Sequence, residues 1–301
     1  MRVVRLADNS YGKSDVRITK VVRSGPTHTL YEFEVQVRLG GDFEAVYTRG
    51  DNSSCIPTDT MKNTVYALSH AREFHSPEEF ARIIASHFIE SFAHVQWAEV
   101  SILQTLWSRI PVDGRLHEHA FTREDSGLRV GHVRHERSGG GAAGDAPRGP
   151  AGLAPRGGEA VRGGLRGLDV IKTTRSGFAD FLVDPYTTLK ETADRIFATR
   201  IDATWELPVT AVDYNRIFQD ARRTILEAFA THDSRSVQQT LYTMGEALLA
   251  RVPEIAEVSF TLPNQHRIPV DLSPFGMSNA NEIFVATREP FGVIDGTVAR
   301  E

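Results

Sequence analysis

Lysine is rare in this chain, which makes each lysine a candidate for chemistry that arginine cannot perform. Lys and Arg together number 34, and the lysines are Lys13, Lys20, Lys62, Lys172 and Lys190. An amine that accepts a proton must be able to lose its charge, whereas a guanidinium stays charged in proteins. Lys13, next to Gly12 near the start of the chain, is therefore the first candidate for a group that transfers protons.

The segment around Lys13 also fits a relaxed phosphate-binding loop. Residues 7–14 read ADNSYGKS, with alanine in place of the first glycine. A phosphate loop must lead into a helix whose N-terminal amides face the phosphates, but residues 15–22 alternate as a strand does, and Asp8 would repel phosphate. Nucleotide hydrolysis is therefore disfavoured. Gly139, Gly141 and Gly144 also match a dinucleotide-binding fingerprint. No strand-turn-helix unit is predicted around them, so this match is disfavoured as well.

Two histidines, His117 and His119, lie two residues apart on a predicted strand. That spacing puts both rings on one face, as metal ligands often are. No third ligand has a convincing spacing, so a surface or hydrogen-bonding role is favoured, as it is for His87 and His94. The sequence therefore predicts no bound metal.

The composition is that of an ordinary globular protein. The 301 residues are 41% hydrophobic, with a net charge of -5 and a pI near 6.1. The chain can therefore bury a large core, and it has no basic excess that would favour nucleic acid or an anionic membrane. Cys55 is the single cysteine, and no apolar run approaches the roughly 18 residues of a membrane span. Without a signal peptide or a C-terminal Ser-Lys-Leu signal, the expected location is the cytoplasm.

Periodicity predicts strands, then two helices, then strands in the first half. Apolar and polar residues alternate over 15–47, helical patterns follow over 59–69 and 77–92, and strands resume over 95–103 and around Ala120. The second helix has a proline in its first turn and an apolar face made of Phe80, Ile83, Ile84, His87 and Phe88.

The second half has a similar predicted order. Strands are expected over 168–173, 258–262, 283–286 and 292–298, and helices over 187–198, 214–230 and 236–251. Two short matches indicate a duplication: TMKNT at 60–64 resembles TLKET at 188–192, and AEVS occurs at 98–101 and at 256–259. An additional helix over 214–230 accounts for the longer spacing in the second half.

A glycine-rich segment without aromatic residues, 138–167, lies between the halves. It cannot bury enough apolar surface to offset its ordering entropy, so a flexible connection is expected. The predicted domains are therefore residues 1–137 and 168–301. The arginines of the segment would suit a nucleic-acid arm, but without interleaved aromatics a solvated linker is the better interpretation.

Five segments together resemble the urate oxidase (uricase) family. They are YGK (11–13), IPTDTMKNT (56–64), YTTLKET continuing to Asp194-Arg195-Ile196, SVQQTLY (236–242) and LPNQH (262–266). They span nearly the whole chain in the family's order. The resemblance implies an α+β fold, the duplicated tunnelling fold (T-fold), in which antiparallel sheets with paired helices on one face assemble into a barrel-lined tunnel.

The resemblance also implies the site. The family's proton-handling residues fall on Lys13, Thr58 and His266. Its purine contacts fall on Phe178, Arg195, Val237, Gln238 and Asn264, together with the backbone of Thr58 and Asp59. These types suit urate, a planar anion, because an arginine fork and a glutamine amide bind its edges and a phenyl ring stacks on its face. Taken singly, Lys13 would be a solvated cation, Thr58 a helix N-cap, Phe178 a core residue, Arg195 a helix surface charge and His266 a strand-face histidine.

The implied activity is oxidation of urate by O2 and water to 5-hydroxyisourate and hydrogen peroxide, on the route to allantoin, without a cofactor. An easily oxidised dianion can surrender one electron first, so the protein needs only to deprotonate and position it. The resemblance further implies a homotetramer whose active sites are shared between subunits. A non-catalytic T-fold protein that binds a purine or pterin is the alternative.

Overall fold

The computed structural model describes residues 4–138, 158–209, 212–287 and 289–301. The chain forms two compact units. Unit 1 is Met1–Gly163 with Glu206–Asn215, and unit 2 is Gly164–Trp205 with Arg216–Glu301. The fingerprint glycines Gly139, Gly141 and Gly144 lie outside the described residues.

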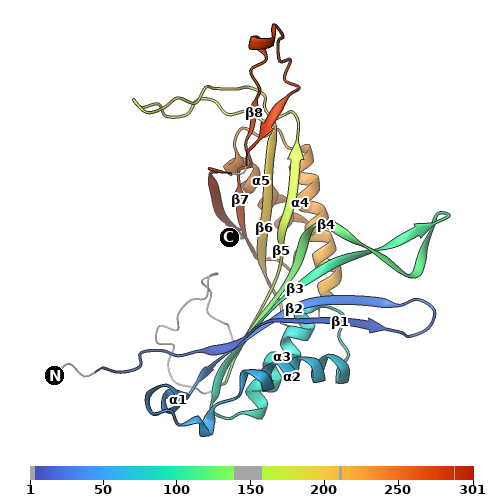
Figure 1. Ribbon diagram of the computed structural model, residues 1–301, viewed down its shortest axis with the longest axis vertical. Helices are drawn as coiled ribbons and strands as arrows, with labels where there is room; N and C mark the ends of the chain where they lie inside the picture. The colour runs from blue at the N-terminus through green and yellow to red at the C-terminus, as the bar shows by residue number, and fades with distance from the viewer. Residues whose placement is uncertain (1–3, 139–157, 210–211, 288) are drawn as a thin grey trace. The chain divides into compact units, whose positions relative to one another are not determined.

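Unit 1 has antiparallel strands with helices packed on one face (Figure 1). The strand order is β1-β2-β3-β4. Alternation creates this face, because Val35, Val37 and Leu39 are fully buried and alternate with polar neighbours. Its elements are β1 (Tyr11–Val22), β2 (Thr29–Gly41), α1 (Glu44–Arg49), η1 (Asn52–Ser54), α2 (Thr58–Ala71), α3 (Pro77–Ser91), β3 (Val95–Val112) and β4 (Arg115–Glu136).

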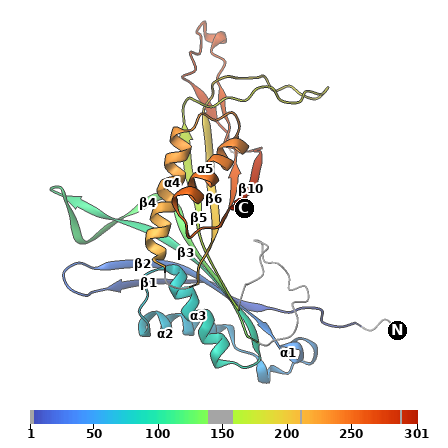
Figure 2. The ribbon, with the colours of Figure 1, turned by 180° about the vertical axis from the view of Figure 1, so that it is seen from behind.

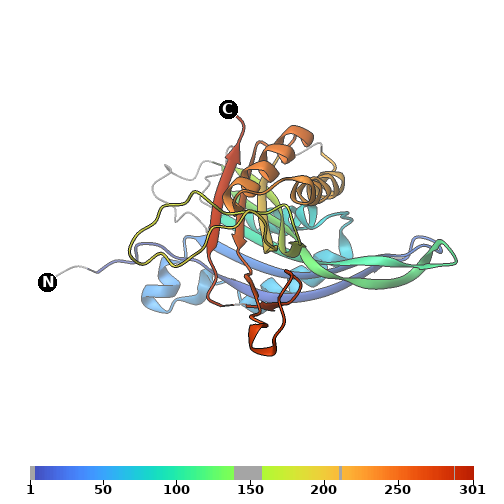
Figure 3. The same ribbon diagram turned by 90° about the horizontal axis from the view of Figure 1, so that it is seen from above.

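Unit 2 repeats this arrangement. Its strand order is β5-β6-β7-β10, and helices α4 and α5 lie side by side against the strands (Figures 2 and 3). A separate two-stranded sheet is formed by β8 and β9. The elements are β5 (Glu159–Lys172), β6 (Phe197–Leu207), α4 (Tyr214–Thr231), α5 (Val237–Arg251), β7 (Glu257–Pro263), β8 (Arg267–Pro269), η2 (Ser273–Phe275), β9 (Phe284–Ala286) and β10 (Val293–Ala299).

The same cationic contacts at helix ends occur in both units. Lys20 on β1 donates to the carbonyl of Arg72 at the end of α2, at 3.0 Å. Lys172 on β5 donates to the carbonyl of His232 just beyond α4, at 2.7 Å. A cation at a helix C-terminus satisfies free carbonyls and complements the helix dipole. The predicted duplication is therefore visible in side-chain contacts as well as in element order.

Two arginines after the last strands repeat this role for the second helix of each unit. Arg137 follows β4 and donates to the carbonyls of Ile89 and Phe92 at the end of α3. Arg300 follows β10 and donates to the carbonyl of Leu249 near the end of α5 and to that of Ile255 in the loop before β7. Each arginine thereby ties the end of a helix to the end of the sheet.

Replacing Arg300 by alanine is expected to lower the free energy of unfolding by about 1.5–3 kcal/mol, because charge-assisted bonds to half-buried carbonyls are lost. The matched control is Arg17→Ala. Arg17 forms an ion pair with Glu34 through a side chain that is 80% exposed, and such pairs contribute about 0–1 kcal/mol. Thermal unfolding followed by circular dichroism measures both. Equal melting temperatures for the two variants would contradict the helix-end role.

The helix predicted over 187–198 is wrong. Residues 187–196 form an irregular segment, and Phe197 begins β6, a strand that the periodicity missed. The backbone of Thr192 forms two hydrogen bonds with that of Phe178, at 2.8 and 3.0 Å, and the amide of Arg195 donates to Ser176. These groups are therefore not available for the bonds that a helix needs. At the start of the segment, the Asp184 carboxylate accepts hydrogen bonds from Tyr186 and Thr187 and holds a turn.

Three smaller corrections follow. Residues 44–49, predicted as part of a strand region, form helix α1, which ends at Gly50 in the left-handed conformation. The glycine-rich connection does not extend to residue 167, because β5 begins at Glu159 and buries apolar residues such as Val161 and Leu165; residues 139–157 lie outside the described part.

The AEVS match lies on equivalent strands, β3 and β7. The match between 60–64 and 188–192 does not, because the first lies in α2 and the second precedes β6.

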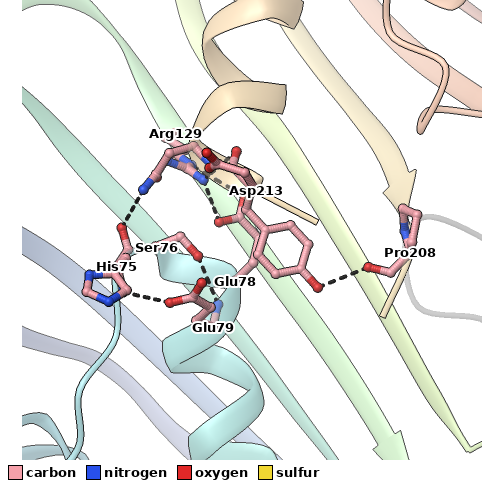
Figure 4. A network of polar contacts seen from close by, with 9 residues as sticks. His75, Ser76, Glu78, Glu79, Arg129, Pro208 and Asp213 are labelled. Carbon is pink, nitrogen blue, oxygen red and sulfur yellow. Dashed lines mark hydrogen bonds and ion pairs between the residues drawn. The ribbon is translucent and has the colours of Figure 1, made fainter. Parts of the chain in front are cut away.

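A buried ion pair within unit 1 anchors residues 214 and 215, the first residues of α4 (Figure 4). The Arg129 Nη2 on β4 lies 2.7 Å from the Glu78 Oε2 on α3, and both side chains are at least 95% buried. Arg129 also donates to the carbonyl of Tyr214 and to Asn215. Burial raises the pKa of Glu78, and the neighbouring Arg129 opposes that shift. Residues 214 and 215 are thereby tied to the sheet that carries β1.

Candidate functional site

Lys13 lies on β1 on the face that the helices cover. Its cross-strand partner is Val37, which is fully buried, and opposite residues of an antiparallel pair share a face. Directly after Lys13 the register shifts before Val16, and Asp15 takes the left-handed conformation with φ 58°. This is a β-bulge, a feature that redirects side chains and is frequent beside active sites. The half-buried Lys13 side chain is therefore placed by the irregularity of its strand.

Helix α2 begins at Thr58. Its N-cap is Pro57, so the interpretation of Thr58 as the N-cap is wrong. The backbone N–H groups of Thr58 and Asp59 lie in the first turn, where a helix provides no acceptor for them. They can therefore donate to an anion, and the helix dipole favours one there.

Lys13 and the start of α2 are carried by elements that pack against each other. The Lys62 ammonium lowers the pKa of Asp59 through a direct hydrogen bond, and the charge of Lys13 also contributes. Helix α2 packs against β1, so Lys13 and the start of α2 lie on neighbouring elements. Unit 1 thus brings together Lys13, Thr58 and Asp59.

Phe178 and Arg195 form the centre of a second group, in unit 2. The Arg195 guanidinium carbon lies 5.3 Å from the centre of the Phe178 ring, which also stacks on Phe181 at 5.0 Å. Burial lowers the pKa of Arg195, but an arginine remains charged at neutral pH. The pair offers a planar cation beside an aromatic face.

Backbone contacts bring the start of α5 to the same place. The carbonyl of Ser176 accepts the amide of Arg195, and the amide of Gly177 donates to the carbonyl of Ser234 at 2.8 Å. Gly177 is required here, because a Cβ would lie 2.9 Å from the carbonyl oxygen of Ala193. Ser236 then caps α5 by accepting from Gln239. This cap places the buried Val237 and the exposed Gln238 at the helix start, three and four residues after Ser234, which contacts Gly177.

Asn264 and His266 follow β7. Asn264 forms a bridge with Thr199 on β6, and its amide donates to the carbonyl of Gly292 at 2.8 Å. Thr199 lies four residues after Arg195, near the start of β6. The bridge therefore holds Asn264 near the end of β6 that follows Arg195. His266 is exposed, and its carbonyl accepts from the amide of Thr287.

Most of the sequence-predicted residues therefore fall into one group in each unit, whereas exposed His266 forms only a backbone contact with Thr287 and is not joined to either group. Lys13, Thr58 and Asp59 lie on neighbouring elements of unit 1, and in unit 2 Phe178 contacts Arg195 while the bond between Gly177 and Ser234 brings the chain that leads to Val237 and Gln238 to the same segment. Prediction missed Asp194, whose carboxylate accepts from Thr174 at 2.8 Å and orders the turn before Arg195. Its position directly before the arginine in the family motif was the available signal.

The phosphate-loop match and the histidine pair lack the surroundings that phosphate binding and metal binding require. Residues 7–10 precede strand β1 and residues 11–14 are its first residues, whereas a phosphate loop leads into a helix. His117 and His119 have rings 4.6 Å apart on β4. Among residues 4–138, 158–209, 212–287 and 289–301, no group of three or more His, Cys, Asp and Glu side chains could hold a metal ion. No helix in the described part of the chain combines the length and the apolar character of a membrane span.

Comparison with known proteins assigns the fold and the family. The family model described as Uricase matches residues 9–134 and 161–295. Over 299 residues the chain is 40% identical to a uricase of Arthrobacter globiformis, which covers 99% of this chain and 91% of that protein. It is 36% identical to a uricase of Dictyostelium discoideum over 98% of this chain and 97% of that protein.

Solved structures agree. A crystal structure of uricase from Arthrobacter globiformis superposes with a TM-score of 0.88 at 39% identity, covering 100% of this chain and 96% of that one. This likeness confirms the predicted α+β T-fold class, with its antiparallel strands and paired helices. The chain belongs to the uricase family.

Proposed function

We propose that the chain is a urate oxidase that uses O2 as co-substrate and no cofactor. The observation that carries the proposal is the unit 2 group, in which the Arg195 guanidinium lies 5.3 Å from the Phe178 ring and Gln238 begins the adjoining helix. A guanidinium donates two parallel bonds to one edge of a planar anion, and an amide supplies one donor and one acceptor to another. An aromatic ring beside them offers a stacking face. This is the set of contacts that urate needs.

The unit 1 group supplies proton transfer in this proposal. With its amine in the neutral form, Lys13 accepts a proton from urate through the hydroxyl of Thr58 and becomes an ammonium, and His266 extends the path. The amides of Thr58 and Asp59 hold the anion at the start of α2. Asn264 contacts the space above the ring where O2 and then water react.

The overall reaction converts urate, O2 and water to 5-hydroxyisourate and hydrogen peroxide. Urate loses two electrons, and O2 gains those two electrons and two protons to become the peroxide. Water supplies the oxygen that forms the new C–O bond. Because the electrons come from the substrate dianion itself, the side chains of the protein need only move protons and hold the reactants in place.

We further propose that the protein is a homotetramer with sites shared between subunits. Each chain supplies two T-fold domains, one built on β1–β4 and the other beginning with β5 at Glu159, and the assembled sheets line a tunnel. Lys13 and Thr58 of one subunit then act on urate held by Arg195 and Gln238 of a neighbour. Association of subunits would also cover the strand edges that each sheet leaves open in a single chain.

Urate turnover by metal-stripped protein tests the proposal. Loss of urate absorbance, O2 uptake and peroxide formation are measured together, and we expect one O2 consumed and one peroxide formed per urate. Binding of urate without O2 uptake in tetrameric protein would instead support a non-catalytic purine- or pterin-binding protein. Activity that returns only after a metal is added would contradict the absence of a cofactor.

Replacing Arg195 by lysine is expected to raise the KM for urate about tenfold or more, because an ammonium cannot form two parallel bonds to one edge. The matched control is Arg200→Lys. Arg200 forms a two-bonded pair with Asp169 on the same stretch of chain, so its replacement tests the same chemistry outside the proposed site. A KM that changes equally in both variants would argue against Arg195 as an edge contact.

A further inference from the structure

Tyr11 connects the two segments that carry the unit 1 part of the proposed site. Its phenol oxygen accepts a hydrogen bond from the amide of Ile56 at 2.8 Å. Tyr11 lies two residues before Lys13 on β1, and Ile56 lies two residues before Thr58. One hydrogen bond therefore spans the gap between the strand of Lys13 and the segment that leads into α2.

The Tyr11 ring is itself fixed from the opposite side. It meets Phe43, which is fully buried, edge to face at 4.9 Å. Its cross-strand partner Leu39 is also fully buried, so the ring projects onto the helix-covered face. Burial raises the pKa of Tyr11, so the phenol stays protonated at neutral pH. The acceptor for Ile56 is thus held in place by packing.

Between Tyr11 and Lys13 the backbone has little freedom to move. A Cβ at Gly12 would lie 1.9 Å from the carbonyl oxygen of Val37, so β1 approaches β2 as closely as only glycine allows. Beyond Lys13 the bulge begins. The position of Lys13 relative to Thr58 therefore depends on the closely packed Gly12 and on the bond from Tyr11 to Ile56.

We infer that Tyr11 is a positioning residue that sets the distance between Lys13 and Thr58 through its hydrogen bond with the Ile56 amide. The inference rests on the proposed function for its catalytic consequence, but the structural link does not depend on turnover. Misplacing a proton-transfer pair by about 1 Å can lower a rate by about 10²-fold. Of the contacts assigned to urate, only those of the Thr58 and Asp59 amides depend on this bond, whereas those of Arg195 and Gln238 do not, so KM should change far less than kcat.

The kinetic test is Tyr11→Phe, which removes only the acceptor oxygen. We expect kcat for urate to fall about tenfold to a hundredfold while KM stays within about twofold. The matched control is Tyr31→Phe. Tyr31 is a buried tyrosine on β2, paired with Lys20 at the far end of β1. The kcat of the Tyr31→Phe variant should therefore stay within about twofold of the wild-type value. A lower melting temperature with unchanged kcat in Tyr11→Phe would show a purely structural role and overturn the inference.

Hydrogen exchange tests the link without relying on urate turnover. In the wild-type protein the Ile56 amide should exchange slowly, and in Tyr11→Phe its exchange should be at least about tenfold faster. Fast exchange of Ile56 in the wild-type protein, or no change in the variant, would overturn the inference even if urate is oxidised. If the wild-type protein does not oxidise urate but Ile56 is protected by Tyr11, the proposed function fails and the structural link stands.

Discussion

Replacing Lys13 by methionine is expected to lower kcat for urate by about 10²- to 10⁴-fold, the range that a positioned proton acceptor contributes. Methionine preserves the length of the lysine side chain up to Cε and removes the amine. Because the contacts to urate are assigned to Arg195, Gln238 and the start of α2, KM should change far less than kcat. Steady-state O2 uptake across a range of urate concentrations separates the two constants.

Lys20→Met is the matched control for this prediction. Lys20 lies on the same strand, donates to the carbonyl of Arg72 at the end of α2 and lies 4.2 Å from the centre of the Phe74 ring. Its loss should lower the melting temperature and leave kcat unchanged. A Lys13→Met protein that keeps most of its kcat would remove Lys13 from the mechanism, whereas equal losses in both variants would show that kcat follows stability.

Sequence periodicity predicted the elements whose apolar pattern is local. Helix α3 was predicted over 77–92 and is found at Pro77–Ser91, and α5 was predicted over 236–251 and is found at Val237–Arg251. Both have a serine N-cap and a regular apolar face, so short-range signals were sufficient. The segment 187–196 failed because its backbone bonds to residues 176 and 178, and pairing across the chain leaves no periodic signature.

Site prediction had a corresponding limit. The motif around Arg195 was found in the sequence, but its contact with Phe178 depends on a bridge between residues 178 and 192 and on Gly177, whose missing Cβ admits the chain from Thr192 to Ala193. Tyr11 stands in the same motif as Lys13, yet its role became apparent only through its bond to Ile56, 45 residues away. Residue types indicated the chemistry, and long-range backbone contacts determined which residues meet.

A mixture of Lys13→Ala and Arg195→Ala chains is expected to recover activity that neither variant has alone. In the proposed tetramer one half of each site comes from unit 1 of one subunit and the other half from unit 2 of a neighbour. After unfolding and refolding together at equal concentrations, about a quarter of the sites should combine an intact Lys13 with an intact Arg195, if subunits assemble at random. Recovered kcat per chain should therefore approach about a quarter of the wild-type value.

The decisive control mixes Lys13→Ala with Thr58→Ala chains. Both changes lie in unit 1, so every site contains one defective half whichever chains assemble, and no recovery is expected. Mass spectrometry of differently labelled chains confirms that hybrids form in both mixtures. Recovery in the first mixture alone places Lys13 and Arg195 of one site on different subunits. Confirmed hybrids without recovery in the first mixture would require each site to be completed within a single chain, because only then would mixing leave every Lys13 paired with its own Arg195.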